Sequence, residues 1–346
     1  MAANFALDEF LWDSGLAQPG EHGDWSPLTG GVSSDIWRVD VNGEVFCVKR
    51  ALGKLKVSAD WFASTRRNAY EWAWLNFAAR HLPGNVPTPL AHHPADGILA
   101  MSFLPSKDYP VWKSRLLGGE VSVGFAREVG QLVGRLHSVS VGEPSLRDVL
   151  GDTESFEAIR LDPYLRATGE RHPQLAAHLH ALIDRTKEIR IAAVHGDISP
   201  KNILVGPAGP VFLDAEASWY GDPAFDLAFC LNHLLLKCLV RPTSQSPYLQ
   251  SFAALSSAYL DQIDWEPRAG LEWRAATLLP ALLLARIDGK SPVEYVTEEA
   301  VKQLARDAAI GMLRTPPVDL ADLARQWHKA TAVLANRDVD LRALMK

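Results

Sequence analysis

The sequence is poor in the features that mark several common classes of protein. Its 346 residues include only three cysteines, and no Cys-x-x-Cys or Cys/His pattern typical of a zinc site occurs. The cysteines, Cys47, Cys230 and Cys238, are odd in number, which argues against a disulfide framework. The chain has no run rich in lysine and arginine, and its formal net charge is −6. These absences argue against nucleic acid and against an anionic membrane surface as partners.

Long hydrophobic segments and targeting signals are also missing. The longest apolar helix candidate covers residues 275–285, which is too short for a bilayer because a spanning helix needs about 20 residues. The first ten residues, MAANFALDEF, contain neither the basic nor the apolar region of a secretory signal. With 47% apolar and 22% charged residues, the composition is that of an ordinary globular protein. We therefore expect a cytoplasmic protein without a membrane partner, and the sequence leaves its oligomeric state open.

The densest set of polar side chains lies in residues 193–228, AVHGDISPKNILVGPAGPVFLDAEASWYGDPAFDLA. Asp197 and Asn202 lie five residues apart, and two short apolar runs joined by a Gly-Pro-Ala-Gly turn lead from Asn202 to Asp214. Such a turn between apolar runs predicts a β-hairpin. The hairpin would bring two carboxylates and an amide to one end.

This set of groups suits magnesium-assisted phosphoryl transfer. That reaction needs a carboxylate that orients the attacking hydroxyl or accepts its proton, and hard oxygen ligands for Mg²⁺. Asp197 is our candidate for the catalytic carboxylate, and Asn202 and Asp214 are our candidates for the metal ligands. The competing interpretation is a polar loop beside a hairpin, without any chemistry.

A second segment with candidate binding groups lies nearer the N-terminus. Asn42-Gly43 separates two alternating apolar segments, which is the strongest short signal for a β-hairpin. The loop before this hairpin can bring backbone N–H groups and hydroxyls close to phosphates, although a Gly-Gly pair before a strand is more often only a turn. The candidate phosphate-binding residues of this loop are Gly30, Gly31, Ser33 and Ser34.

Lys49 ends the second strand of this hairpin, in the segment VFCVK. Alternation along a strand puts Cys47 and Lys49 on one face. Aromatic residues at helical spacing then predict a helix over about residues 60–80, which carries Glu71. An exposed strand-end lysine and a solvated glutamate are the alternatives for Lys49 and Glu71. Beyond them, residues 98–104 are typical of a buried strand.

The motifs together resemble a known superfamily. His-Gly-Asp-x-x-x-x-Asn at residues 195–202, followed by Leu-Asp-Ala-Glu and Gly-Asp-Pro-Ala-Phe-Asp-Leu-Ala, is similar to the aminoglycoside phosphotransferase and choline kinase superfamily. The fold of that superfamily is that of the protein kinases, so the resemblance implies an α+β, two-lobe protein-kinase-like fold. We expect an N-lobe at residues 1–105, with an antiparallel sheet plus a helix, and a mostly helical C-lobe at residues 106–346.

The resemblance also implies cofactors and residue roles. ATP and Mg²⁺ would be the cofactors, and a small molecule with a hydroxyl group would be the substrate. Lys49 would reach the α- and β-phosphates, with Glu71 as its ion-pair partner and Cys47 lining the adenine pocket. The backbone groups that would hydrogen-bond adenine belong to Ser102, Phe103 and Leu104.

Four more positions complete the comparison with the superfamily. His195 and Asp226 would support the catalytic loop without taking part in the chemistry. Glu216 resembles the second acid of the Asp-x-Glu motif in choline and methylthioribose kinases, so it is either a further metal ligand or a surface carboxylate. Protein kinases carry a lysine where this chain has Ser199, and Lys201 need not replace that lysine.

The acceptor is harder to predict. The run SWYGDPAFD most resembles methylthioribose kinases and suggests a sugar-like alcohol, while aminoglycosides and amino alcohols stay open. A polar cluster follows the apolar helix of residues 275–285. In it, Arg286 and Lys290 are candidates for binding an anionic group and Asp288 for binding an amine or hydroxyl, unless the cluster is only a capped helix end.

These observations predict an enzyme that uses ATP and Mg²⁺ to phosphorylate a hydroxyl of a small molecule. One rival is a catalytically silent nucleotide-binding scaffold. A protein kinase is the other rival, and the Leu-Asp-Ala-Glu segment, which lacks the phenylalanine of the protein-kinase switch, argues against it.

Overall fold

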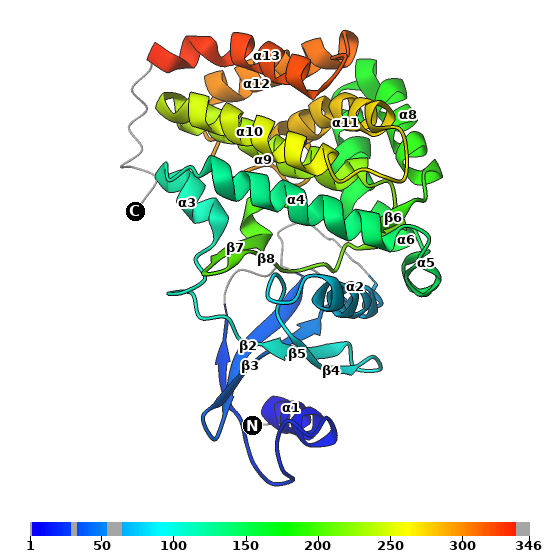
Figure 1. Ribbon diagram of the computed structural model, residues 1–346, viewed down its shortest axis with the longest axis vertical. Coiled ribbons are helices and arrows are strands. Elements are labelled where there is room, and N and C mark those ends of the chain that lie inside the picture. Colours follow the sequence, from blue (N-terminus) through cyan, green and yellow to red (C-terminus); the bar gives the residue numbers. More distant parts are fainter. Residues whose placement is uncertain (1, 29–32, 54–63, 337–346) are drawn as a thin grey trace.

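The chain forms two lobes of different composition in the computed structural model, which describes residues 2–28, 33–53 and 64–336 (Figure 1). The first lobe contains an antiparallel sheet with strand order β1-β2-β3-β5-β4. Its elements are α1 (Ala2–Asp13), β1 (Asp24–Pro27), β2 (Ser34–Val41), β3 (Glu44–Ala51), α2 (Arg67–His81), β4 (Pro89–His93) and β5 (Ile98–Ser102). The second lobe is mostly helical. The predicted α+β, kinase-like two-lobe fold is therefore confirmed.

The hairpin of β2 and β3 occupies the centre of the sheet. Asn42 and Gly43 turn the chain with φ values of 54° and 91°, which are the left-handed values that a two-residue hairpin turn requires. The resulting register pairs Ile36 with Lys49. Because side chains alternate along a strand, Val48 belongs to the core on one face of the sheet and Lys49 lies on the opposite face.

Different helices cover the two faces of this sheet. Ile98 and Ala100 of β5 join the core formed with α1, whereas Leu99 and Met101 join the larger core that includes α2. Leu11 of α1 is fully buried against the outer face. The N-terminal helix is thus a structural layer of the lobe, seen at the end of the molecule farthest from the helical lobe in Figure 1.

Helix α2 starts later than the pattern of aromatic residues predicts. The predicted start near residue 60 falls among residues outside the described ranges, and the described helix begins at Arg67. Tyr70, Trp74 and Phe77 are buried in the larger core, as their helical spacing predicts. Glu71 is also buried, because this helix lies between the sheet and the second lobe.

The second lobe consists of helices and two short antiparallel strand pairs. Its helices are α3 (Trp112–Gly118), α4 (Val123–Ser140), α5 (Pro144–Leu150), α6 (Glu154–Phe156), α7 (Ala167–Arg171), α8 (Ala176–Glu188), α9 (Ala224–Val240), α10 (Gln245–Leu260), α11 (Arg268–Asp288), α12 (Glu299–Arg314) and α13 (Leu320–Thr331). The strand pairs are β6 (Ala192–Val194) with β9 (Trp219–Gly221) and β7 (Ile203–Gly206) with β8 (Gly209–Phe212). The predicted catalytic hairpin is β7-β8.

Helix α9 is the centre of this lobe. Every residue of α9 is buried, which follows from its nearly continuous apolar sequence. It packs against α10 and α11, and α10 in turn packs against the long helix α4 (Figure 1). Within the described ranges, no helix is both long enough and apolar enough to cross a membrane.

Candidate active site

The loop that follows β6 depends on a glycine. Gly196 has a φ of +76°, and a β-carbon at this position would lie 2.4 Å from the carbonyl oxygen of Ala217. Glycine alone accommodates both the left-handed backbone and the close approach. The contact presses the loop carrying Asp197 against the segment that carries Asp214 and Glu216.

Two buried side chains hold this loop in place. The carboxylate of Asp226 accepts hydrogen bonds from the backbone N–H groups of His195 at 2.7 Å and Gly196 at 2.8 Å. His195 Nε2 lies 3.1 Å from the carbonyl oxygen of Leu213, and its Nδ1 accepts from the backbone N–H of Asp197 at 3.2 Å. Burial lowers the pKa of His195, so the neutral ring can donate through Nε2 and accept through Nδ1. This geometry is that of structural supports.

Asn202 lies beside the segment that leads to Asp214. Its Nδ2 donates to the backbone oxygen of Asp197 at 3.2 Å, and its backbone oxygen accepts from the N–H of Leu213 at 2.9 Å. Asp214 has a φ of +65°, an uncommon conformation for a residue with a side chain. Such outliers concentrate at functional sites. The loop and the strand end are therefore tied together at the candidate metal ligands.

The donor set fits a nucleotide-associated Mg²⁺ ion. Asn202 and Asp214 offer an amide oxygen and a carboxylate, which are hard oxygen donors. Across the described residues, no cluster of three or more His, Cys, Asp or Glu side chains is arranged to hold a metal ion by itself. Mg²⁺ is commonly held by one or two carboxylates together with phosphates and water. The two residues therefore fit an ion that shares its ligands with a bound nucleotide.

Lys49 lies buried between carboxylates from separate segments. Its Nζ is 2.9 Å from Glu71 Oε1 and 2.8 Å from Glu71 Oε2, and it also contacts Asp214. Burial disfavours the charged ammonium, but attraction to Asp214 and Glu71 outweighs burial and raises the pKa of Lys49. Burial likewise opposes ionisation of Asp214, and Lys49 reverses this effect and lowers the pKa of Asp214. The end of β3 thus carries a fixed positive charge.

Glu216 is a buried carboxylate, so the surface alternative is wrong. Its Oε2 accepts from Nε of Arg67 at 3.0 Å. Arg67 is fully buried and also donates to the backbone oxygens of Ser33 and Leu52. This arginine joins the acidic segment to the start of β2 and the end of β3. No sequence motif indicated a role for Arg67, because its partner Glu216 lies 149 positions away in the chain.

The candidate phosphate loop is only partly described. Gly30 and Gly31 lie outside the described residues. Ser33 and Ser34 are buried, and among the described residues the hydroxyl of Ser34 has no hydrogen-bond partner. Cys47 faces the core shared with α2, and burial raises the pKa of its thiol to about 12. The thiol is therefore a neutral group, which is compatible with the lining of an adenine pocket.

The first residue expected to bind adenine uses part of its polar groups within the protein. The backbone N–H of Ser102 donates to the backbone oxygen of Thr88 at 2.9 Å, and its hydroxyl accepts from the N–H of Thr88 at 2.9 Å. Ser102 is thus engaged in the sheet edge between β4 and β5. Phe103 and Leu104 follow the end of β5. The adenine contacts expected of the backbone at Ser102, Phe103 and Leu104 remain predictions.

Asp197 carries two cationic partners. Arg160 Nη2 and Lys201 Nζ lie 2.8 Å and 3.0 Å from the same carboxylate oxygen of Asp197. Burial would raise the pKa of Asp197, but Arg160 and then Lys201 outweigh burial and lower it. The sequence alone did not require Lys201 to replace the protein-kinase lysine near this position. The ion pair between Lys201 and Asp197 shows that a lysine four residues after Asp197 reaches the carboxylate of Asp197.

Arg160 is a site residue that the sequence patterns missed. It lies in the π-helical segment Glu157–Arg166, which contains Pro163. A proline within a helix removes a backbone donor, and wide helical turns are frequent at functional sites. The internal proline was the available signal for irregular structure, but it could not show that Arg160 contacts a residue 37 positions later.

The predicted substrate cluster lies at the end of α11, which includes Arg286 and Asp288, and its residues have different surroundings. The carboxylate of Asp288 lies 2.7 Å from His172 Nε2 and pairs with Arg306 at 2.7 Å, so it fastens α11 to its neighbours. Arg286 donates to the hydroxyl of Tyr164 at 3.3 Å. The side chain of Lys290 is exposed. For Asp288, these contacts correspond to the alternative of a capped helix end.

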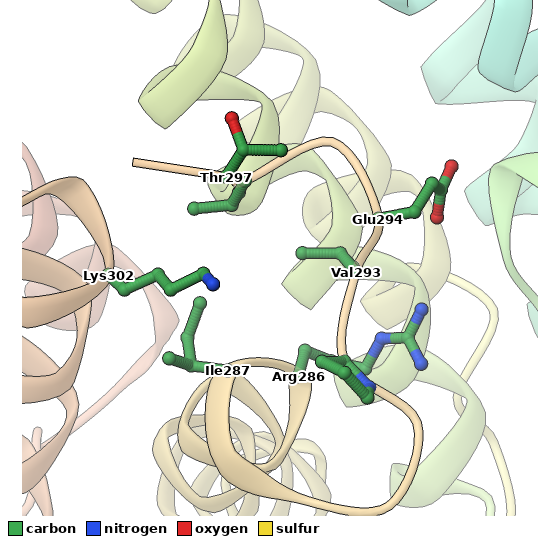
Figure 2. A pocket seen from close by; sticks show the side chains of 8 residues that line it. Arg286, Ile287, Val293, Glu294, Thr297 and Lys302 are labelled. Carbon is green, nitrogen blue, oxygen red and sulfur yellow. The ribbon is translucent and has the colours of Figure 1, made fainter. Parts of the chain in front are cut away.

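A cavity of about 310 Å³ lies beside this cluster. Its lining is Arg286, Ile287, Pro292, Val293, Glu294, Val296, Thr297 and Lys302. In Figure 2 the ammonium of Lys302 points into the space between the labelled side chains, and the guanidinium of Arg286 points away from Lys302. The guanidinium of Arg286 donates to Tyr164 and to Ser291.

Comparison with known proteins defines the family. The family model described as the phosphotransferase enzyme family matches residues 24–271. The chain belongs to this family. The matched range includes both lobes and all the site residues from Lys49 to Asp226 described above. The predicted resemblance to aminoglycoside phosphotransferases and choline kinases is thereby confirmed, while the closer likeness to methylthioribose kinases stays a prediction.

Solved structures of kinases share the fold of this family member. A choline/ethanolamine kinase family protein from Mesorhizobium loti aligns with a TM-score of 0.53 at 16% identity, over 96% of this chain and 100% of that chain. An ethanolamine kinase from Plasmodium vivax aligns with a TM-score of 0.55 at 12% identity, over 95% of this chain and 88% of that chain. No curated protein matches the sequence. At these identities the likeness shows the fold alone.

Proposed function

We propose that this phosphotransferase is a small-molecule kinase that uses ATP and Mg²⁺ to phosphorylate an alcohol. One observation carries the proposal: the buried Lys49 joins Glu71 and Asp214, while Asn202 of the Asp197 loop is tied to the residue before Asp214. A phosphate-binding cation, metal-binding oxygens and a carboxylate for the acceptor thus lie in one site. Phosphoryl transfer requires these groups and little covalent chemistry from the protein.

In the proposed reaction, the chain's residues position charge and hold one proton. Lys49 binds the phosphates of ATP, and Asn202 and Asp214 would hold Mg²⁺, which neutralises charge that develops on the phosphates. The oxygen of the acceptor alcohol forms a bond to the γ-phosphorus, and the bond to the ADP oxygen breaks with its electron pair staying on ADP. Asp197 orients the hydroxyl and accepts its proton. Its lowered pKa makes it a weak base, which suits a loose transition state with late proton transfer.

The same proposal assigns the two lobes their tasks. The N-lobe, residues 1–105, would contribute the phosphate loop, Cys47 and Lys49, and the backbone at Phe103 and Leu104 would bind the base. The C-lobe, residues 106–346, would contribute the catalytic loop and bind the acceptor. Glu216 is buried within reach of Arg67, so we assign it to holding the acidic segment, with a further metal contact as the alternative.

An ADP-release assay across sugars, amino alcohols and aminoglycosides tests the proposal. We expect Mg²⁺-dependent turnover with at least one class of acceptor, and loss of turnover by about 10³-fold in Asp197→Asn, which removes the proton acceptor. Binding of an ATP analogue should be retained by Asp197→Asn. Wild-type turnover in Asp197→Asn would overturn the catalytic assignment. Nucleotide binding without turnover of any acceptor would favour the silent scaffold instead.

A further inference from the structure

One face of α9 changes from aromatic to basic along its length. Phe229, His233 and Lys237 follow one another at intervals of four residues, so they share a helix face. The rings of Phe229 and His233 are 5.4 Å apart. The ammonium of Lys237 lies 4.0 Å from the ring centroid of Tyr295. All three α9 side chains are buried, so this helix brings an imidazole and an ammonium into the interior of the C-lobe.

A continuous series of contacts joins this face to the catalytic carboxylate. Arg160 pairs with Asp197, and its guanidinium lies 5.8 Å from the ring centroid of Phe229. The ring of Tyr164 lies 5.6 Å from that of Phe229, and the guanidinium of Arg286 lies 5.7 Å from Tyr164. The basic groups therefore extend from Asp197 into the interior of the C-lobe.

Few carboxylates balance this charge. Across the described part of the chain, neither Lys237 nor Arg286 lies within ion-pair distance of a carboxylate, and Lys113 pairs with Glu294, whose side chain is 64% exposed. In the same ranges, the buried Nε of Arg286 and the buried hydroxyl of Tyr295 have no hydrogen-bond partner. Burial, together with Lys113 and Arg286, lowers the pKa of Lys237 to about 7. A buried charge without a partner is costly, so this arrangement favours a ligand that supplies negative charge.

We propose that the acceptor alcohol carries an oxyanion, as a carboxylate or a phosphate ester, and that the cationic face formed by Arg160, Lys237 and Arg286, with the imidazole of His233 beside them, recognises it. This inference rests on the proposed kinase function and names the charge of its substrate. The oxyanion competes with Asp197 for the guanidinium of Arg160. Binding the correct substrate thus frees the Asp197 carboxylate for the acceptor hydroxyl. A cationic acceptor would meet uncompensated like charge at the same place.

Charge-matched acceptors test the inference. The first set is glycerate, glycerol 3-phosphate, glycerol and 3-amino-1,2-propanediol; the second is gluconate, glucose 6-phosphate, glucose and glucosamine. We expect the best anionic member of a set to exceed its neutral and cationic counterparts at least tenfold in kcat/KM. Preference for the neutral or cationic members would overturn the inference and leave the kinase function standing. The carboxylate and phosphate members distinguish the two sources of the oxyanion.

Binding measurements test the preference of the protein for an anionic acceptor separately from catalysis. The same compounds are titrated by calorimetry into protein saturated with Mg²⁺ and a non-hydrolysable ATP analogue. Tighter binding of an anionic member supports the inference, even if no compound is turned over, in which case the kinase function is the part that fails. Binding that is equal across charges, or absent for every anionic member at millimolar concentration, overturns the inference.

The variant Lys237→Met tests whether the buried ammonium of Lys237 takes part in binding the anion. Methionine keeps most of the volume and removes the buried charge, so we expect an unchanged or higher Tm and at least tenfold weaker binding of the anionic probe. Lys329→Met, on the exposed face of α13, makes the same change in net charge and should alter neither. Arg286→Gln serves as a second variant if Lys237→Met does not fold. A lower Tm in Lys237→Met, with unchanged anion binding in both variants, would overturn the inference.

Discussion

At the scale of single residues, the site is built from buried ion pairs whose members come from distant segments. Lys49 on β3 meets Glu71 on α2 and Asp214 after β8. Removing one member of such a group leaves the others desolvated and unpaired, which costs more than the pair itself contributes. Stability measurements can therefore detect the group without any knowledge of the substrate.

A double-mutant cycle on Lys49 and Glu71 tests this coupling. Lys49→Met alone should lower the free energy of unfolding by about 3 kcal/mol, because the buried carboxylate of Glu71 and the partly buried carboxylate of Asp214 lose their cation. Glu71→Gln removes one of these carboxylates, so the double variant should be less destabilised than the sum of the single variants by at least about 1 kcal/mol. Urea denaturation of the four proteins gives the coupling. Additive effects would show that Lys49 and Glu71 do not interact in solution.

Sequence patterns predicted these residues with unequal success. Lys49, Asp197, Asn202 and Asp214 stand in short motifs whose spacing reflects local strand and loop geometry, so they could be found by eye. Arg160 gave no local signal, because its importance depends on a contact made across the folded lobe.

At the scale of elements, the loop between β6 and β7 is fixed more by backbone geometry than by side-chain packing. Gly196 combines a left-handed backbone with the approach of Ala217. Gly15 has nearly the same φ, +73°, but a β-carbon there would meet no atom within 4 Å. Substitutions at Gly15 and Gly196 therefore separate the free-energy cost of the left-handed backbone from the cost of the steric contact.

Alanine substitutions at these glycines should differ in their effect. Gly15→Ala is expected to cost about 1 kcal/mol of stability, since it adds only the strain of a left-handed alanine. Gly196→Ala should cost at least about 2 kcal/mol more and should lower kcat, because the catalytic loop must move away from Ala217. Thermal unfolding and the ADP-release assay measure both effects. Equal costs at the two positions would contradict the steric argument.

Helix α1 illustrates an element whose presence but not whose role could be predicted. Its sequence has helical character, but the partner that buries it is a sheet face formed by strands far along the chain. Leu11→Ala should lower stability by about 2–5 kcal/mol, because the leucine is fully buried. Glu9→Ala on the exposed face of the same helix should change stability little, as measured by urea denaturation. Similar losses for both would show that α1 does not pack on the sheet.

At the scale of the whole molecule, the kinase-like fold brings Asp197 into contact with Asn202 of the proposed nucleotide site and with Arg160 of the proposed acceptor site. The hairpin at Asn42-Gly43 was predictable because its turn follows from local sequence, whereas the two-lobe architecture was predicted from the resemblance of the motifs to a known superfamily. The charge of the acceptor side was not predictable in the same way. It arises where α3, the π-helical segment, α9 and the end of α11 meet around one interior face.

That interior charge should appear in the pH dependence of global stability. The pKa of Lys237 is about 7 in the folded protein and about 10.4 in an unfolded chain. Between these values the unfolded chain binds more protons than the folded one, so the free energy of unfolding gains up to about 1.4 kcal/mol per pH unit from this residue. Lys113 and Arg286 also face Lys237. Despite burial, the contact with Lys113 lowers the pKa of Glu294, and burial favours the neutral forms of His233, Cys238 and Tyr295.

Comparison of wild type with Lys237→Met isolates this contribution. We expect the variant to be more stable than wild type at pH 7, and its advantage to shrink as the pH is raised to 9, because removing the proton that Lys237 loses on folding costs less free energy at higher pH. Urea denaturation at pH 7, 8 and 9 measures the difference, with Lys329→Met as a control whose difference from wild type should stay near zero. A constant difference between Lys237→Met and wild type would mean that Lys237 keeps its ordinary pKa. In that case an anion or a solvent path already compensates its charge before any substrate binds.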